Sequence, residues 1–259
     1  MKYYLRSTAR AERELFAPAT VTMSAGHPNL SPGDPIHVYI DHSNLTIGGD
    51  TFCQYHDMGH LRPWHYDIKA LRHMIMQNLD LIGTANLGSV LLNIYGADLK
   101  NNTQIELFCK KGEIRSVFEC PRNGNGKEKE ADTQLTADMQ ARVSDTHSFL
   151  RDNYSRRFLQ TNYAQSFPGQ CVFVVISSDA DMIPAVRSAA NAGFYVHVWA
   201  WKSSISPLFW DTRNQLADPE RIRIHYLDNH VQELSQIHIR KNRDRREADV
   251  DDASTTRPV

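Results

Sequence analysis

The chain has 259 residues, which is enough for one main domain with extensions. Its formal net charge is −1, so any contact with nucleic acid must use a local basic patch. The four cysteines form no Cys-x-x-Cys pair, which is typical of free thiols in a reducing compartment. The N-terminus has no apolar signal core, and no run approaches the ~20 apolar residues of a membrane span. We therefore expect a soluble intracellular protein, cytoplasmic or nuclear.

Composition divides the chain into three parts. Residues 1–34 are predicted to be an N-terminal extension, with a short helix and a linker rich in proline, glycine and serine. Residues 35–234 carry the apolar runs of the main domain. Residues 235–259 contain the basic run Arg240–Arg246 and then acidic residues, so we expect a charged, disordered tail. The basic run suits a solvated tail, an RNA contact or nuclear import.

The main domain alternates strand-like and helix-like runs, and short apolar runs bounded by turn residues predict six strands. The expected strands are Ile36–Ile40, Ser89–Tyr95, Ile114–Glu119, Cys171–Ser177, Phe194–Trp201 and Ile222–Leu227. The expected helices are Tyr66–Leu79, Asp132–Gln160 and Asp181–Ala192. Near-continuous apolar runs at 90–94 and 172–176 indicate strands that are buried on both faces. The pattern predicts an α/β fold, with a mostly parallel sheet flanked by helices in three Rossmann-like layers.

Aspartates follow the ends of several predicted strands. Asp41 ends the first strand, Asp98 follows the second, Asp179 and Asp181 follow the fourth, and Asp132 opens the long helix. Ligands of parallel sheets bind beyond the carboxyl ends of the strands. Carboxylates gathered there repel one another unless a cation lies among them, and oxygen ligands suit Mg²⁺ or Mn²⁺. Singly, Asp132 and Asp181 also suit helix N-caps, and Asp98 an ordinary loop.

Three stretches, taken in order, resemble the NYN domain family, a branch of the PIN-like nuclease superfamily. They are VYIDHSNLTIG, KEADTQLTADM and VFVVISSDADMIPAVRSAANAGFYVHVWAWKSSISPLF. The resemblance spans Ile36 to Leu234. It implies a PIN-like fold and a metal-dependent ribonuclease that hydrolyses phosphodiester bonds of RNA, with single-stranded RNA preferred.

The resemblance also implies roles for individual residues. Asp41, Asp132, Asp179 and Asp181 correspond to the catalytic acids that hold one or two Mg²⁺ or Mn²⁺ ions, and Asn44 to the polar residue that supports them. In that mechanism the metal activates water and stabilises charge on the scissile phosphate.

Further residues are expected to contact the nucleic acid. The turn after the fifth strand of the family offers hydroxyls and N–H groups to a phosphate, and a basic stretch precedes the long helix. His42 departs from the family, in which many relatives have glycine beside the first acid. Asp138 also matches a family acid, but it lies ~600° round the helix from Asp132, so we assign it a structural role. The expected contacts are His42, Arg122, Lys127, Lys129, Ser203 and Ser204.

One segment after the first strand has two readings. It contains four residues of zinc-ligand type, but their spacing matches no closed site. They are Cys53, His56, His60 and His65. In the other reading, the segment is a long loop whose Trp64, Tyr66 and histidines line a nucleic-acid groove. Trp201 is expected in the core, with stacking on a base as the alternative.

Other functions stay open at this point. A non-catalytic NYN module that binds RNA or a protein partner would keep the fold, and so would a structure-specific DNA nuclease. A haloacid-dehalogenase-like phosphatase needs an acid two residues after Asp41, where Ser43 stands. The RNA target, the cleavage position and the oligomeric state do not follow from the sequence.

Overall fold

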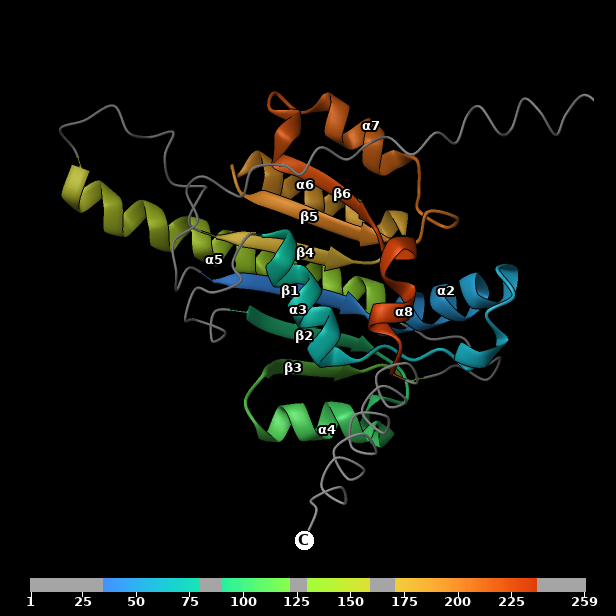
Figure 1. Ribbon diagram of the computed structural model, residues 1–259. Coiled ribbons are helices and arrows are strands. Elements are labelled where there is room, and N and C mark those ends of the chain that lie inside the picture. The colour runs from blue at the N-terminus through green and yellow to red at the C-terminus, as the bar shows by residue number, and fades with distance from the viewer. Residues whose placement is uncertain (1–34, 80–89, 122–129, 159–170, 237–259) are drawn as a thin grey trace, which may run out of the picture.

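The computed structural model of the chain describes residues 35–79, 90–121, 130–158 and 171–236 (Figure 1). The predicted N-terminal extension, the basic residues Arg122, Lys127 and Lys129, and all but the start of the predicted tail lie outside these ranges. Within the described residues, no helix combines the length and the apolar character needed to cross a bilayer.

Six parallel strands form one sheet in the order β3-β2-β1-β4-β5-β6. Their bounds are β1 (Ile36–Asp41), β2 (Val90–Gly96), β3 (Ile114–Glu119), β4 (Val172–Ile176), β5 (Tyr195–Ala200) and β6 (Ile222–Tyr226). Each agrees with its predicted strand to within one residue at either end. The central strands β1 and β4 are buried at every position, which is why their sequences are continuously apolar.

Helices cover both faces of the sheet, as predicted, and make a three-layer fold (Figure 1). On one face, Val38 and Ile40 of β1 pack in a core with residues of α3 and α8. On the other face, Tyr39 of β1 and Phe173 of β4 pack with residues of α5 and α6. Because side chains alternate along a strand, β1 sends Asp41 to the same face as Tyr39.

The described residues contain seven α-helices and several short 3₁₀ helices. The α-helices are α2 (His42–Tyr55), α3 (Ile68–Asn78), α4 (Thr103–Lys110), α5 (Ala131–Phe158), α6 (Ile183–Asn191), α7 (Leu208–Gln215) and α8 (Val231–Leu234). The 3₁₀ helices are η1 (Gly59–Leu61), η3 (Leu99–Asn101), η5 (Ala180–Met182), η6 (Pro219–Arg221) and η7 (Leu227–His230). The predicted helices correspond to α3, α5 and η5 with α6. The sequence did not predict α2, α4, α7 or α8.

A helix, α2, follows β1 directly and ends at Tyr55, so it overlaps the first residues of the predicted loop, Cys53 to Tyr66. The rest of that segment is loop apart from η1. Two adjacent glycines, Gly48 and Gly49, lie inside α2 and let two large side chains approach its backbone. A Cβ atom on Gly48 would overlap the indole of Trp201, and one on Gly49 would overlap that of Trp64. Glycine normally disfavours a helix, but here its lack of a side chain is what permits the packing.

The aromatic side chains considered for base stacking are buried. Trp64 and Trp201 are 1% and 0% exposed, and Tyr66 is 5% exposed. The indole N–H of Trp201 donates to the Leu45 carbonyl over 3.1 Å, and that of Trp64 donates to the Val231 carbonyl over 3.2 Å. These rings therefore belong to the core, as expected for Trp201, and the proposal that Trp64 and Tyr66 line a groove is wrong.

Candidate metal centre

The strand order of the sheet reverses beside β1. β2 and β3 lie on one side of it, and β4, β5 and β6 lie on the other. In open parallel sheets such a reversal leaves a crevice beyond the carboxyl ends of the two central strands. Asp41 is the last residue of β1, and Asp179 is the N-cap of η5, soon after β4 ends. Two of the predicted acids therefore stand at this crevice.

Three carboxylates form an acidic cluster, which we define as Asp132, Asp179 and Asp181. Each offers one oxygen, and the three oxygens lie within 4.8 Å of one another. Asp132 comes from the first turn of α5, and the other two come from the start of η5. Among the described residues, this is the one group of three or more histidine, cysteine or acidic side chains close enough to share a metal ion. An all-oxygen donor set of this kind fits Mg²⁺ or Mn²⁺.

Asp41 lies outside the acidic cluster and has a structural role of its own. It is the N-cap of α2, and its Oδ1 accepts the Asn44 N–H over 2.9 Å. Its Oδ2 accepts the Ser177 hydroxyl over 3.2 Å, and the residue is only 5% exposed. Asp41 therefore caps a helix while its carboxylate is fixed at the end of β1.

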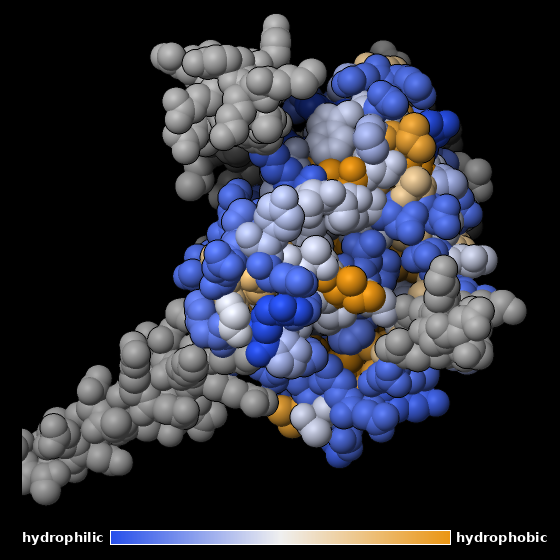
Figure 2. Space-filling view, turned by 90° about the vertical axis from the view of Figure 1, so that its right-hand side faces the viewer, coloured by the Kyte–Doolittle hydropathy of each residue, from blue (hydrophilic) through white to orange (hydrophobic). Residues whose placement is uncertain are grey.

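Asp41 and Asp132 line one cavity of about 340 Å³, which we call the site cavity. Its walls come from β1, α2, the start of α5 and the turn after β5. The lining residues are Asp41, Ser43, Asn44, Ile47, Gly48, Thr51, Glu130, Ala131, Asp132, Ser203 and Ser204. Figure 2 looks onto the end of the sheet where the strands finish, and the surface there is mostly hydrophilic with small separate hydrophobic patches.

Asn44 connects the two central strands. Its Oδ1 accepts the backbone N–H of Ser178 over 3.0 Å, so the first turn of α2 is tied to the chain that leaves β4. The next residue, Asp179, donates its own N–H to the Ser177 hydroxyl over 3.2 Å. Asn44 thus holds the segment that carries two acids of the cluster.

The turn after β5 brings the predicted serines to the site cavity, where both are exposed. The Ser204 hydroxyl donates to the Ser178 hydroxyl over 2.9 Å. The backbone N–H groups of Ser204 and Ile205 donate to the Trp201 carbonyl over 3.1 and 3.0 Å. Because the Ser204 hydroxyl and the N–H groups of Ser204 and Ile205 already donate hydrogen bonds, the Ser203 hydroxyl is better placed than these groups to bind a phosphate oxygen.

His42 lies away from the residues that line the site cavity. Its Nδ1 lies 3.0 Å from the Tyr66 hydroxyl, and it is not among the residues that line the site cavity. Burial, and then the charge of His65, lower the pKa of His42 to about 4. Burial, and then the charge of Asp41, raise the pKa of Tyr66. At neutral pH His42 is therefore an uncharged partner of Tyr66.

The four residues of zinc-ligand type after β1 are spread over different environments. Cys53 is fully buried inside α2, whereas His56, His60 and His65 are exposed. Burial raises the pKa of the Cys53 thiol, which favours the protonated form. The four residues do not form a group with shared metal-ligand geometry.

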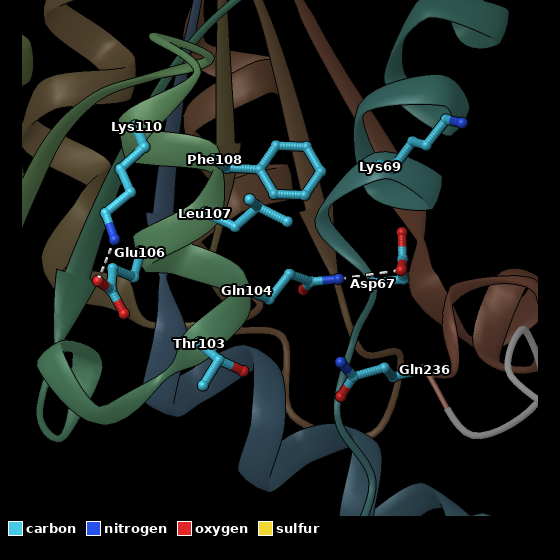
Figure 3. Close-up of a pocket in the computed structure, with 9 residues that line it drawn as sticks. All are labelled: Asp67, Lys69, Thr103, Gln104, Glu106, Leu107, Phe108, Lys110 and Gln236. Carbon is cyan, nitrogen blue, oxygen red and sulfur yellow. Dashed lines mark hydrogen bonds and ion pairs between the residues drawn. The ribbon is translucent and has the colours of Figure 1, made fainter.

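A larger hollow of about 600 Å³ lies between α3 and α4 (Figure 3), and no residue of the acidic cluster lines it. Four of its polar side chains are paired with one another. Gln104 donates to Asp67 over 2.9 Å, and Lys110 pairs with Glu106 at 2.6 Å. Asp67 also caps α3 through the Ala70 N–H. This arrangement stabilises two helix starts and offers no cluster of reactive groups.

Sequence reasoning missed the contribution of α2 to the site. Ile47 and Thr51 lie one turn apart on α2, and both line the site cavity. The signal that could have found this helix is Asp41 itself, because aspartate is a preferred N-cap and its partner is the N–H three residues on. The paired glycines pointed instead to a loop.

Fold and site together define an α/β protein with an all-parallel sheet and an acidic cluster where the strand order reverses. Comparison of the chain with family models, with curated proteins and with solved structures finds no match.

Proposed function

We propose that the protein is a metal-dependent ribonuclease that resembles NYN domains and hydrolyses single-stranded RNA. The observation that carries the proposal is the acidic cluster of Asp132, Asp179 and Asp181 at the reversal of strand order. Its residues come from the same stretches that resemble the family motifs. Three carboxylates this close repel one another, so a cation would relieve a cost that the bare cluster carries.

In this proposal the acidic cluster holds Mg²⁺ or Mn²⁺, and Asp41 lines the site cavity together with Asp132, one member of the cluster. A divalent cation bound there would act as a Lewis acid toward water and toward a phosphate oxygen. Both oxygens of Asp41 already accept a hydrogen bond, so its carboxylate keeps one orientation as substrate enters. The Ser203 hydroxyl donates to a phosphate oxygen from the opposite wall.

One face of α2 gives a path for the nucleic acid away from the site cavity. Ile47, Thr51 and Tyr55 follow one another at four-residue spacing, so they share that face. Ile47 is 66% exposed and Tyr55 is 87% exposed, which is unusual for side chains of this size. Unpaired bases stack on exposed aromatic side chains such as Tyr55 without regard to sequence. We infer that single-stranded RNA runs along this face.

The first test is cleavage of labelled single-stranded RNA and DNA by the purified chain with Mg²⁺, Mn²⁺ or EDTA. Attack by water leaves 5′-phosphate and 3′-hydroxyl ends, and a 2′-methoxy group at the cut site should not abolish cleavage. Two histidines acting on the 2′-hydroxyl would instead give cyclic phosphates without metal. Cyclic products that persist in EDTA would therefore refute the proposal. Binding of RNA with no cleavage would favour a non-catalytic module, and cleavage of DNA alone would favour a DNA nuclease.

The second test separates metal binding from catalysis. Mn²⁺ should raise the melting temperature of the parent chain, because a ligand of the folded state stabilises it. Asp132→Asn and Asp179→Asn should lose this rise and all cleavage. Without metal they should melt no lower than the parent, since one repelling charge is gone. Asp211→Asn, an exposed acid on α7, serves as the matched control and should behave as the parent. If Mn²⁺ raises the melting temperature of all four proteins equally, the metal binds somewhere other than the acidic cluster.

A further inference from the structure

A second cavity, of about 260 Å³, lies between α5 and the strands β1, β2 and β3. We call it the α5 cavity. Its lining includes His37, Tyr39, Tyr95, Arg115, Asp138 and Arg142. It shares no lining residue with the site cavity. Arg142 lies ten residues along α5 from Asp132, which is about 15 Å of helix.

The α5 cavity brings together two arginines that form no ion pair with any described acid. Arg115 comes from β3 and Arg142 from α5. Asp138, an acid of the same lining, already accepts two hydrogen bonds. They come from the Tyr95 hydroxyl over 2.9 Å and from the Gln134 amide over 2.7 Å. A second acid, Asp145, is exposed, and no ion pair joins it to either arginine. Arg115 is exposed and Arg142 is half-buried, and neither guanidinium group has a carboxylate partner among the described residues.

His37 is a third group in this cavity without a partner. It is 4% exposed, and its Nδ1 has no hydrogen-bond partner. Its ring stacks on Phe173 with a centroid distance of 5.4 Å. A buried polar atom without a partner costs free energy and is uncommon in folded proteins. Burial first, and then the charges of Arg142 and Arg115, lower the pKa of His37 to about 4.

The other polar groups along the strands are already used. The Asn93 amide donates to the Val38 carbonyl over 3.0 Å and accepts the Ser116 hydroxyl over 2.8 Å. The Tyr95 hydroxyl donates to Asp138, as described above. The groups without a hydrogen-bond partner are two guanidinium groups, which are donors, and the Nδ1 of His37, with the exposed carboxylate of Asp145 at the same cavity. A ligand that brings acceptors and negative charge fits the two guanidinium groups. A guanidinium group binds the oxygens of phosphate in pairs, and two of them match a dianion.

The size of the α5 cavity limits the ligand. Small-molecule sites usually begin near ~300 Å³, so this one accepts a phosphate group with at most a small body. Tyr39 and Tyr95 stack with centroids 6.4 Å apart and give the cavity an aromatic wall. We propose that the α5 cavity binds a phosphate dianion, either free or as a small phosphate monoester, between Arg115 and Arg142 with His37 beside it.

Calorimetric titration of the full chain with inorganic phosphate, and separately with ribose 5-phosphate, tests this inference. The parent should bind one equivalent of at least one of the two, and the tighter ligand tells free phosphate from an ester. Arg115→Ala and Arg142→Ala should each weaken binding about tenfold or more, because each removes a charged fork. Arg142→Lys keeps the positive charge but loses the planar guanidinium group that binds two phosphate oxygens at once, so its loss of phosphate affinity should be smaller than that of Arg142→Ala.

A matched variant places the phosphate in the α5 cavity. Arg187→Ala changes an exposed arginine on α6, which does not line the α5 cavity, so it should bind phosphate as the parent does. Bound phosphate should also shift the NMR signals of the His37 imidazole in the parent but not in Arg142→Ala. That readout does not depend on nuclease activity. No binding by the parent, or parental binding by both alanine variants at Arg115 and Arg142, would overturn the inference.

Discussion

The backbone N–H of Ser178 donates to the side-chain oxygen of Asn44 over 3.0 Å, which ties the end of β4 to the start of α2. The two residues lie far apart in the sequence, yet their bond joins the first turn of α2 to the segment that follows β4. Asp41 stands on one side of this bond and Asp179 on the other. The geometry of the candidate site therefore depends on one amide that carries no charge.

Asn44→Ala should lower the free energy of unfolding by ~1–3 kcal/mol, because it leaves the Ser178 N–H without its acceptor. It should also reduce cleavage, since the segment that carries Asp179 and Asp181 loses its tie to α2. Urea denaturation measures the first effect. Asn78→Ala, which removes a bond of 3.0 Å to the Met74 carbonyl near the end of α3, is the control and should cost under ~0.5 kcal/mol. Equal losses in the two variants would contradict the role given to Asn44.

Asp41 has two roles, and two substitutions separate them. Asp41→Asn keeps an oxygen for the Asn44 N–H, and asparagine caps helices as well as aspartate does, so stability should change little. Asp41→Ala removes the cap and should cost ~0.5–2 kcal/mol. Both variants lose the carboxylate and should lose cleavage of RNA. If Asp41→Asn cuts RNA at the parental rate, Asp41 is only a helix cap.

Gly48→Ala and Gly49→Ala should each destabilise the fold by ~1–3 kcal/mol, because the new methyl group would overlap the indole of Trp201 or Trp64. A loss of stability on replacing glycine by alanine is unusual here, since alanine is favoured over glycine inside a helix by up to ~1 kcal/mol. Gly59→Ala is the matched control, because no atom lies within 4 Å of the position that its methyl group would take. Thermal melting compares the three variants. A neutral Gly48→Ala would mean that Trp201 can move aside.

Stability should fall as pH drops from about 6.5 toward 4, in buffer without phosphate. The pKa of His37 is lowered by burial, and then by Arg142 and Arg115, from 6.5 to about 4. The unfolded chain therefore binds the proton first, so the stabilisation is complete above pH 6.5 and is lost as pH falls toward 4. The loss for this one group is on the order of 3 kcal/mol at pH 4.

His37→Phe isolates this contribution, because phenylalanine can keep the stacking on Phe173 and cannot take up a proton. The difference in stability between parent and variant should change with pH over the same window. Urea denaturation at pH 7 and pH 4.5 measures it. A constant difference at the two values would show that the buried imidazole does not titrate as inferred.

The sheet could be predicted from the sequence because its central strands are buried on both faces. Val172–Ile176 is a continuous apolar run, Val90–Gly96 is apolar except at Asn93 and Gly96, and short runs of this kind are typical of covered parallel strands. Asp179 and Asp181 followed from the same logic, since the carboxyl ends of parallel strands share one edge, whereas Asp132 followed from its place at the start of the long helix and from the family resemblance. The meeting of Asp132, Asp179 and Asp181 confirms that part of the prediction.

The remaining features depend on contacts between distant segments. Gly48 and Gly49 look like loop residues until Trp201 and Trp64 are seen to pack on them. Local patterns therefore missed α2 and with it the cap formed by Asp41. The meeting of Arg115 and Arg142 also follows from how α5 crosses the sheet, which periodicity does not fix. Both features are tertiary, and a single sequence carries little information about them.

The strand order has a consequence for how the chain is made. β1 pairs with β2, which follows it, and with β4, which leaves the ribosome only after β2, β3 and α5. Until then the central strand has one open edge, a row of unpaired backbone groups flanked by apolar side chains. Such pairing over long sequence distance is slow, and the open edge is prone to aggregation. A nascent chain that pauses before residue 171 would therefore need protection by a chaperone more than one that pauses after β4.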